Sequence, residues 1–74
     1  MAQKYEVFHE VGWNERTNSA EYEKLTTMKN EKAAIAFINN IDNIGKYGNM
    51  FIEAKLGGKI CVYNERTDCW EPKQ

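Results

Sequence analysis

An alternation of apolar and polar residues with a period of two is the strongest constraint on the fold of this chain. Residues 5–13 place one apolar set on the same side, namely Tyr5, Val7, His9, Val11 and Trp13. Residues 50–56 repeat the pattern with Met50, Ile52, Ala54 and Leu56. Because successive side chains of a β-strand point to opposite faces, each segment is expected to bury one face and leave the other in water. The sequence therefore predicts a sheet with one apolar face.

One segment between these strands has helical spacing instead. Its apolar residues recur at i, i+3, i+4 and i+7, as Ala34, Phe37, Ile38 and Ile41. Asn30 precedes the stripe as an N-cap, and Gly45 follows it as a residue that readily adopts the left-handed conformation that ends a helix. We expect a single helix, followed by a loop at residues 45–49.

The first hairpin joins residues 5–13 to a second strand at about 20–28 through the polar turn 14–19. Two registers are open. One places Phe8 beside Leu25 and Glu10 beside Glu23, and the other sets His9 against Glu23. Like charges directly opposite each other are unfavourable, but neither register satisfies every position.

A second hairpin follows, with Gly57 and Gly58 at its turn and a strand at 59–63. A three-residue loop at 57–59 would keep Ile60 and Val62 on the same face as the apolar set of residues 50–56. Residues 64–68 turn the chain again, and a short last strand at 69–71 stops at Pro72.

The element order is thus ββαβββ, which predicts a two-layer α+β domain with an antiparallel sheet and one helix packed on one face. A chain of 74 residues has room for one modest core, so we expect a single domain over 1–74 with an ordered core at about 4–72. The formal net charge of −1 does not supply the general basic field of a nucleic-acid-binding domain.

Several other classes of protein are not expected. No apolar run approaches the roughly 20 residues of a membrane span, and the N-terminus reaches charged residues without the apolar stretch of a secretory signal, so we predict a cytoplasmic protein with no membrane partner. Cys61, Cys69 and His9 do not amount to a zinc-ligand set, and no cofactor or metal is predicted. Without a phosphate loop, metal cluster or nucleophile motif, we predict no enzymatic activity.

A short repeat is the most unusual local feature. Residues 13–17 read Trp-Asn-Glu-Arg-Thr and residues 63–67 read Tyr-Asn-Glu-Arg-Thr, and these copies contain the only two arginines of the chain. One interpretation is that the same polar turn is needed twice, which accounts for Asn and Thr. It does not account for the Glu-Arg pair.

Strand directions place both copies, together with residues 45–49, at one end of the expected domain. Loops on a rigid scaffold often carry recognition, arginine holds carboxylates or phosphates, and Trp and Tyr are favoured interface anchors. The candidate partner-binding residues are therefore Trp13, Glu15, Arg16, Lys46, Tyr47, Tyr63, Glu65 and Arg66. The alternative is that Glu15 and Glu65 serve only to neutralise the neighbouring arginines.

The outer sheet face is a second candidate surface. Residues 1–28 sum to a charge of −2, so we expect this face to be acidic with an apolar centre at Phe8 and Leu25, suited to a basic partner. The prediction from sequence is a non-enzymatic interaction module that binds another protein through the three-loop end or this face. The alternatives are a small domain that binds nucleic acid or phosphate through Arg16, Arg66 and Lys46, and a homodimeric structural or regulatory protein of phage or mobile-element type.

Overall fold

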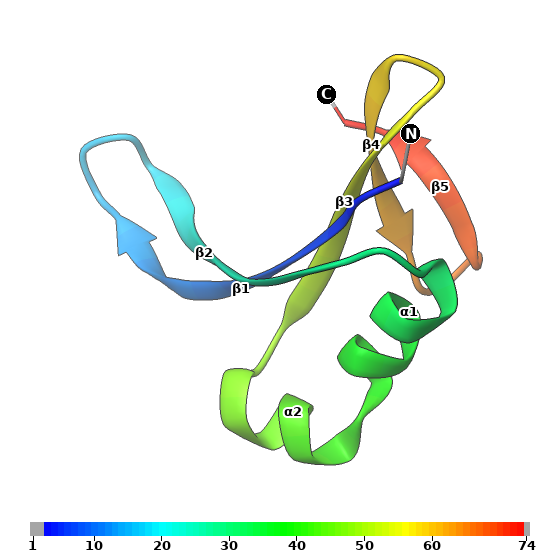
Figure 1. Cartoon of the computed structure of the whole chain (residues 1–74). Helices are drawn as coiled ribbons and strands as arrows, with labels where there is room; N and C mark the ends of the chain where they lie inside the picture. Colours follow the sequence, from blue (N-terminus) through cyan, green and yellow to red (C-terminus); the bar gives the residue numbers. More distant parts are fainter. Residues whose placement is uncertain (1–2, 74) are drawn as a thin grey trace.

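The computed structural model describes residues 3–73 and shows a five-stranded antiparallel sheet with two short helices beneath it (Figure 1). The sheet order is β2-β1-β3-β4-β5. The α+β class is confirmed, whereas the order is ββααβββ because two helices stand where one was expected. The elements are β1 (Tyr5–Asn14), β2 (Ser19–Met28), α1 (Glu31–Asn39), α2 (Ile41–Tyr47), β3 (Met50–Leu56), β4 (Lys59–Asn64) and β5 (Cys69–Pro72).

The expected single helix is broken at Asn40. Asn30 caps the start of α1 as predicted, because its side chain accepts from the backbone N–H of Ala33 at 3.2 Å. Asn40 has an extended backbone, with φ −71° and ψ 124°, and its Oδ1 accepts from the N–H of Asp42 at 2.9 Å. A side chain that bonds to the backbone ahead of it begins a new helix. The break turns Ile41 out of the predicted stripe, and its exposed fraction is 82%.

The second helix also changes the loop that was expected at 45–49. Gly45 lies within α2, and the helix ends instead at Gly48, whose φ is 73°. Lys46 and Tyr47 are therefore helical residues, and the connection to β3 is reduced to residues 48 and 49. The prediction that Gly45 ends the helix was wrong, because the chain leaves the helix at Gly48, whose positive φ glycine adopts readily.

The second hairpin has a tighter turn than predicted. Gly57 and Gly58 have φ values of 58° and 81°, as a two-residue type I′ turn requires, and Leu56 pairs with Lys59. The expected three-residue loop was wrong by one residue, and a slip of one reverses every side chain of a strand. Ile60 and Val62 therefore lie on the face away from the helices, while Cys61 and Tyr63 are buried.

The first hairpin adopts the register that sets His9 against Glu23. Two bulges interrupt it, one beside Leu25 and one at Val11. β1 pairs with β3 only as far as His9, which faces Met50, so the remainder of the hairpin continues past the sheet. We call residues 11–22 the arm, and Figure 1 shows it projecting on the left, away from the helices.

The core lies between the sheet and α1. The buried side chains that form it come from β1, β3, β4 and α1, namely Val7, Ala34, Ile38, Met50, Ile52 and Tyr63. Trp70 packs at its margin and donates its indole N–H to Glu31 at 2.9 Å, which ties β5 to the first turn of α1. The predicted inward set of β3 is buried up to Ala54. The predicted inward position of Val11 and Trp13 was wrong, because the bulge at Val11 shifts the alternation of β1 and turns Trp13 to the outer face, and both side chains are exposed.

Candidate functional site

The two copies of the repeat form equivalent turns. In the first, the Asn14 side chain accepts from the N–H of Arg16 at 2.9 Å and donates to Glu21 at 2.9 Å. In the second, Asn64 accepts from the N–H of Arg66 at 2.9 Å. It also donates to Glu71 at 3.3 Å.

Each turn then closes on a residue of positive φ, Asn18 at 52° and Asp68 at 54°. Asn and Asp tolerate this conformation better than most residues. The equivalence therefore extends to Glu21 and Glu71, and turn geometry explains why asparagine begins each copy.

The second turn carries an additional bond that the first lacks. The Tyr63 hydroxyl donates to the carboxylate of Asp68, and this bond, together with burial and the negative charge of Asp68, raises the pKa of Tyr63 from 10 to about 12. Tyr63 is buried against Trp70, with ring centroids 5.5 Å apart. Tyr63 is thus a core residue that holds the β4–β5 turn, whereas Trp13 at the matching position is exposed.

The predicted three-loop end does not form as one surface. The β1–β2 and β4–β5 turns follow strands that run in the same direction, but they belong to opposite edges of the sheet. The arm, residues 11–22, projects to the left of Figure 1, whereas the β4–β5 turn, residues 65–68, lies on the right. The expectation that the two turns lie side by side was wrong, because sheet order and the length of the arm separate them.

Lys46 and Tyr47 form a third, separate group beneath β1. The Tyr47 carbonyl oxygen lies 3.3 Å from Nδ1 of His9, and the Tyr47 ring meets the His9 ring edge-on at 5.4 Å. The ammonium group of Lys46 lies 5.2 Å from the centre of the Tyr47 ring. Tyr47 therefore supports the inner side of β1, and Lys46 does not approach either arginine-containing turn.

The Glu-Arg pairs themselves are exposed. Among residues 3–73, neither Arg16 nor Arg66 has a carboxylate oxygen within 4.0 Å. The structure therefore shows no neutralising contact between each arginine and its neighbouring glutamate, and it brings together no cation cluster from Arg16, Arg66 and Lys46.

The outer face of the sheet, the face away from the helices, has an aromatic cluster at its centre. Phe8 of β1 stacks on Phe51 of β3 with ring centroids 5.2 Å apart and an interplanar angle of 12°. Tyr22 of β2 meets Phe51 edge-on at 4.9 Å. Val62 of β4 joins them, and these side chains line a shallow hollow of about 440 Å³ together with Glu53 and Lys73.

The arm extends this apolar surface beyond the sheet. Trp13 pairs with Ala20, two residues from Tyr22 on β2, so Trp13 and Tyr22 point to the same face. Trp13 is 60% exposed, Tyr22 53% and Val11 49%. Half of the large hydrophobic residues recorded as exposed in the described chain therefore lie on the arm.

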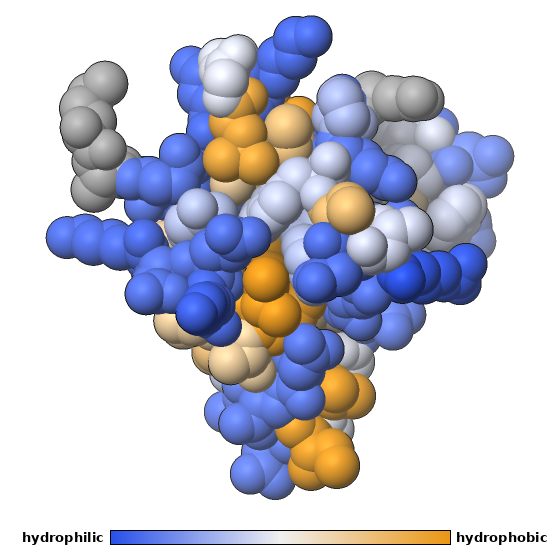
Figure 2. Space-filling view, turned by 90° about the vertical axis from the view of Figure 1, so that its right-hand side faces the viewer, coloured by the Kyte–Doolittle hydropathy of each residue, from blue (hydrophilic) through white to orange (hydrophobic). Residues whose placement is uncertain are grey.

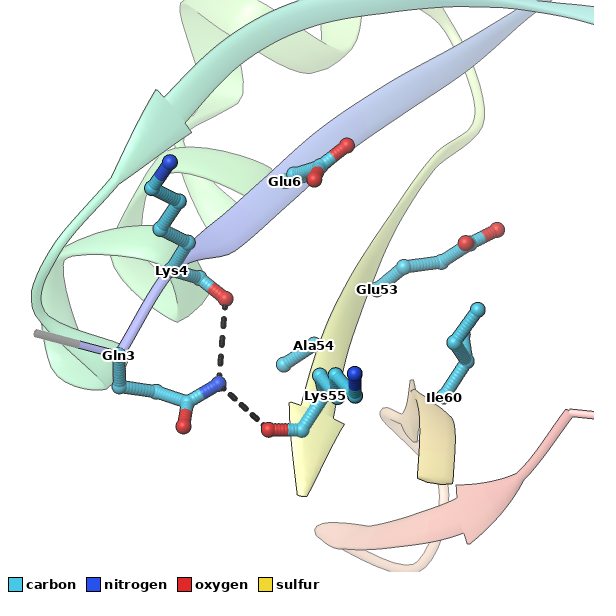
Figure 3. A pocket seen from close by; sticks show the side chains of 7 residues that line it. All are labelled: Gln3, Lys4, Glu6, Glu53, Ala54, Lys55 and Ile60. Carbon is cyan, nitrogen blue, oxygen red and sulfur yellow. Dashed lines mark hydrogen bonds between the residues drawn. The ribbon is translucent and has the colours of Figure 1, made fainter. Parts of the chain in front are cut away.

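A second hollow lies beside the aromatic cluster, where β1, β3 and β4 meet the start of the described chain (Figure 3). It measures about 650 Å³, and Glu6, Glu53, Lys55 and Ile60 contribute to its lining. The Gln3 side chain closes one side by donating to the Lys55 carbonyl at 2.9 Å. The lining mixes both signs of charge, and no group of acids, histidines or cysteines converges in it.

The outer face is balanced in charge, which corrects the expectation that it is acidic. Glu21 and Glu23 lie on the helix-facing side of β2, because Glu23 pairs with inward-facing His9. Leu25 also packs toward the core, at a bulge. Strand pairing and the residues that line the hollows identify the charged side chains of the outer face. The acidic ones are Glu6, Glu10, Glu53 and Glu71, and the basic ones are Lys4, Lys24, Lys55 and Lys73.

The side of the molecule opposite the arm differs from the outer face. Figure 2 shows apolar atoms there in small separate patches among hydrophilic ones, with one patch at the lower end, where α2 lies in Figure 1. Exposed Ile41 and Ile44 belong to α2. This patch is carried by a single helical turn and lacks the aromatic cluster of the outer face.

Residues 3–73 contain no group of three or more His, Cys, Asp or Glu side chains arranged to hold a metal ion. Neither helix in the described part of the chain has the length and apolar character needed to cross a membrane. No protein-family model, curated protein or solved structure matches the chain.

Sequence reasoning found only part of the apolar outer surface. Phe8 and Phe51 were expected to face outward and do so. Ile60 and Val62 were assigned to the opposite face, and Tyr22 was not selected. The glycine pair at 57–58 was the available signal, because a two-residue turn fixes the register that brings Val62 outward.

Proposed function

We propose that this chain is a non-enzymatic protein-interaction module that binds through the outer face of its sheet and the arm. The observation that carries the proposal is the aromatic cluster of Phe8, Phe51 and Tyr22 on the outer face, with exposed Trp13 farther along the arm on the same face. Aromatic residues are enriched at protein interfaces, where they bury a large area at a small cost in conformational entropy.

Charge supports a protein partner over nucleic acid. The outer face carries equal numbers of carboxylates and ammonium groups, whereas binding to a phosphate backbone depends on clustered cations. The alternative, a domain that binds nucleic acid or phosphate, depends on Arg16, Arg66 and Lys46 acting together, and these residues lie on separate parts of the molecule. Cytoplasmic location remains a prediction from sequence.

The test is affinity purification from the native cell with three tagged forms of the chain. These are the wild type, a face variant with Trp13→Ser and Tyr22→Ser, and a turn variant with Arg16→Ala and Arg66→Ala. Each sample is divided and analysed by mass spectrometry with and without nuclease treatment.

We expect the face variant to lose the proteins that the wild type retains, and the turn variant to keep them after nuclease treatment. Loss of the retained proteins on nuclease treatment would favour the nucleic-acid alternative. If the turn variant alone loses them, the binding surface is a turn and the proposal for the outer face fails. Circular dichroism of each variant checks that the fold is retained.

A further inference from the structure

We infer that a second copy of this chain covers the outer face, so that two copies associate through their aromatic clusters and arms. The inference rests on the proposed function, since it names a partner for the same surface.

The chain exposes more surface than its mass requires. A compact monomer of 8.6 kDa is expected to expose about 4,700 Å². The structure exposes 5726 Å². The excess is about 1,000 Å², which is comparable to the roughly 800 Å² per partner that a standard stable interface buries.

The shape of the molecule agrees with this excess. The radius of gyration is 12.7 Å, whereas a compact chain of this length is expected to have about 11 Å. The arm makes the molecule more extended than a compact chain, because it is a two-stranded hairpin that continues past the last pairing of β1 with β3. An isolated two-stranded hairpin is at best marginally stable in water, and the contact of Tyr22 with Phe51 ties the base of the arm to the sheet.

The chemistry of the face suits a copy of itself. In an association with two-fold symmetry the same patch meets itself, so a strongly charged patch would be repelled. Here the outer face carries four carboxylates and four lysines, so it has no net charge that would repel a second copy of itself. The exposed Trp13 of each arm supplies the kind of side chain that fills a shallow aromatic hollow.

The first measurement is the mass in solution, by light scattering or sedimentation, from low micromolar to near millimolar concentration. Reducing agent and the Cys69→Ser variant are used throughout, because Cys69 is exposed and a disulfide would also link two chains. We expect the mass to rise from 8.6 kDa to twice that value as concentration increases.

Two charge substitutions then locate the contact. Trp13→Glu is expected to weaken self-association by at least about tenfold, since buried tryptophans dominate interface energies. Ile41→Glu is the matched control, because it places the same charge at an apolar residue that is also exposed, 82% against 60% for Trp13, but lies on α2. We expect Ile41→Glu to leave the association within about twofold of the wild type.

The two tryptophans give an internal readout. The indole N–H of Trp13 lies on the proposed interface, whereas that of Trp70 is bonded to Glu31. In nuclear magnetic resonance spectra recorded over the same concentrations, we expect the Trp13 indole signal to shift and the Trp70 signal to stay in place.

A monomer at every concentration would overturn the inference. So would a dimer that Ile41→Glu weakens and Trp13→Glu does not. These outcomes are distinguishable from failure of the proposed function. If the chain is a monomer but its captured proteins are lost in the face variant, the proposed function stands and only the second copy is excluded. If the chain is a monomer and the face variant captures the same proteins as the wild type, both proposals fail.

Discussion

Several asparagine side chains of this chain hold the local backbone in place by accepting hydrogen bonds from it. Asn14, Asn40 and Asn64 each bond to N–H groups just ahead of them in the chain. Asn18 and Asp68 have positive φ. At this scale the repeated Asn-Glu-Arg-Thr is a turn used twice, with exposed Glu and Arg side chains at each copy.

The Tyr63–Asp68 bond predicts a dependence of stability on alkaline pH. Because the pKa of Tyr63 is raised from 10 to about 12 in the folded state, the contribution of this tyrosine is fully present below pH 10. It is lost as the pH rises through about 12. We expect Tyr63→Phe to be less stable than the wild type at pH 8, with a difference that shrinks as pH rises above 10.

Urea unfolding of both proteins over this pH range measures that difference. Tyr22→Phe is the control, because it removes a phenol on the outer face that has no bond to Asp68. A difference between wild type and Tyr63→Phe that stays constant from pH 8 to beyond 11 would contradict the assignment.

At the scale of the elements, one asparagine decides that there are two helices. The apolar stripe Ala34, Phe37 and Ile38 ends at α1, and Asn40 restarts the helix in a new direction. Its side chain accepts from the N–H of Asp42 and Asn43.

We therefore expect Asn40→Ala to destabilise the protein by about 1 kcal/mol, as loss of an N-cap does. The cost should be concentrated in α2, where hydrogen exchange of the backbone amides is predicted to accelerate. Asn39→Ala is the matched control, since Asn39 is an exposed residue inside α1 and alanine favours helix. Equal effects of the two substitutions would show that the cap does not hold α2.

The whole molecule depends on a small core. Val7 and Ile52 are its largest fully buried side chains, and they lie opposite each other on β1, which continues into the arm, and on β3, the central strand. A domain of this length is expected to have an unfolding free energy of only about 4–11 kcal/mol.

Ile52→Ala is therefore expected to remove about 2–5 kcal/mol, a large share of the total stability, whereas Ile52→Val should cost about 1 kcal/mol. Ile41→Val, at a residue 82% exposed, should change the stability by less than about 0.5 kcal/mol. Urea midpoints rank the three variants. An Ile41→Val effect as large as that of Ile52→Val would mean that α2 is covered in solution, for instance by another chain.

The sequence by itself determined the features that depend on neighbouring residues. Period-two alternation located the strands, Asn30 located the start of the first helix, and the polar repeats located two turns. The alternation also predicted correctly which residues of β1, up to His9, and of β3, up to Ala54, face inward, because alternation is a local property of a strand.

Only the tertiary structure decided which face β4 presents and where the arm lies. The face depends on a turn of two residues or three, and one residue of slip exchanges Ile60 and Val62 for Cys61 and Tyr63. The position of the arm depends on sheet order and on where β1 stops pairing with β3, which are contacts between residues distant in sequence. The apolar outer surface depends on both the facing of β4 and the position of the arm, so it could be recognised only in the assembled sheet.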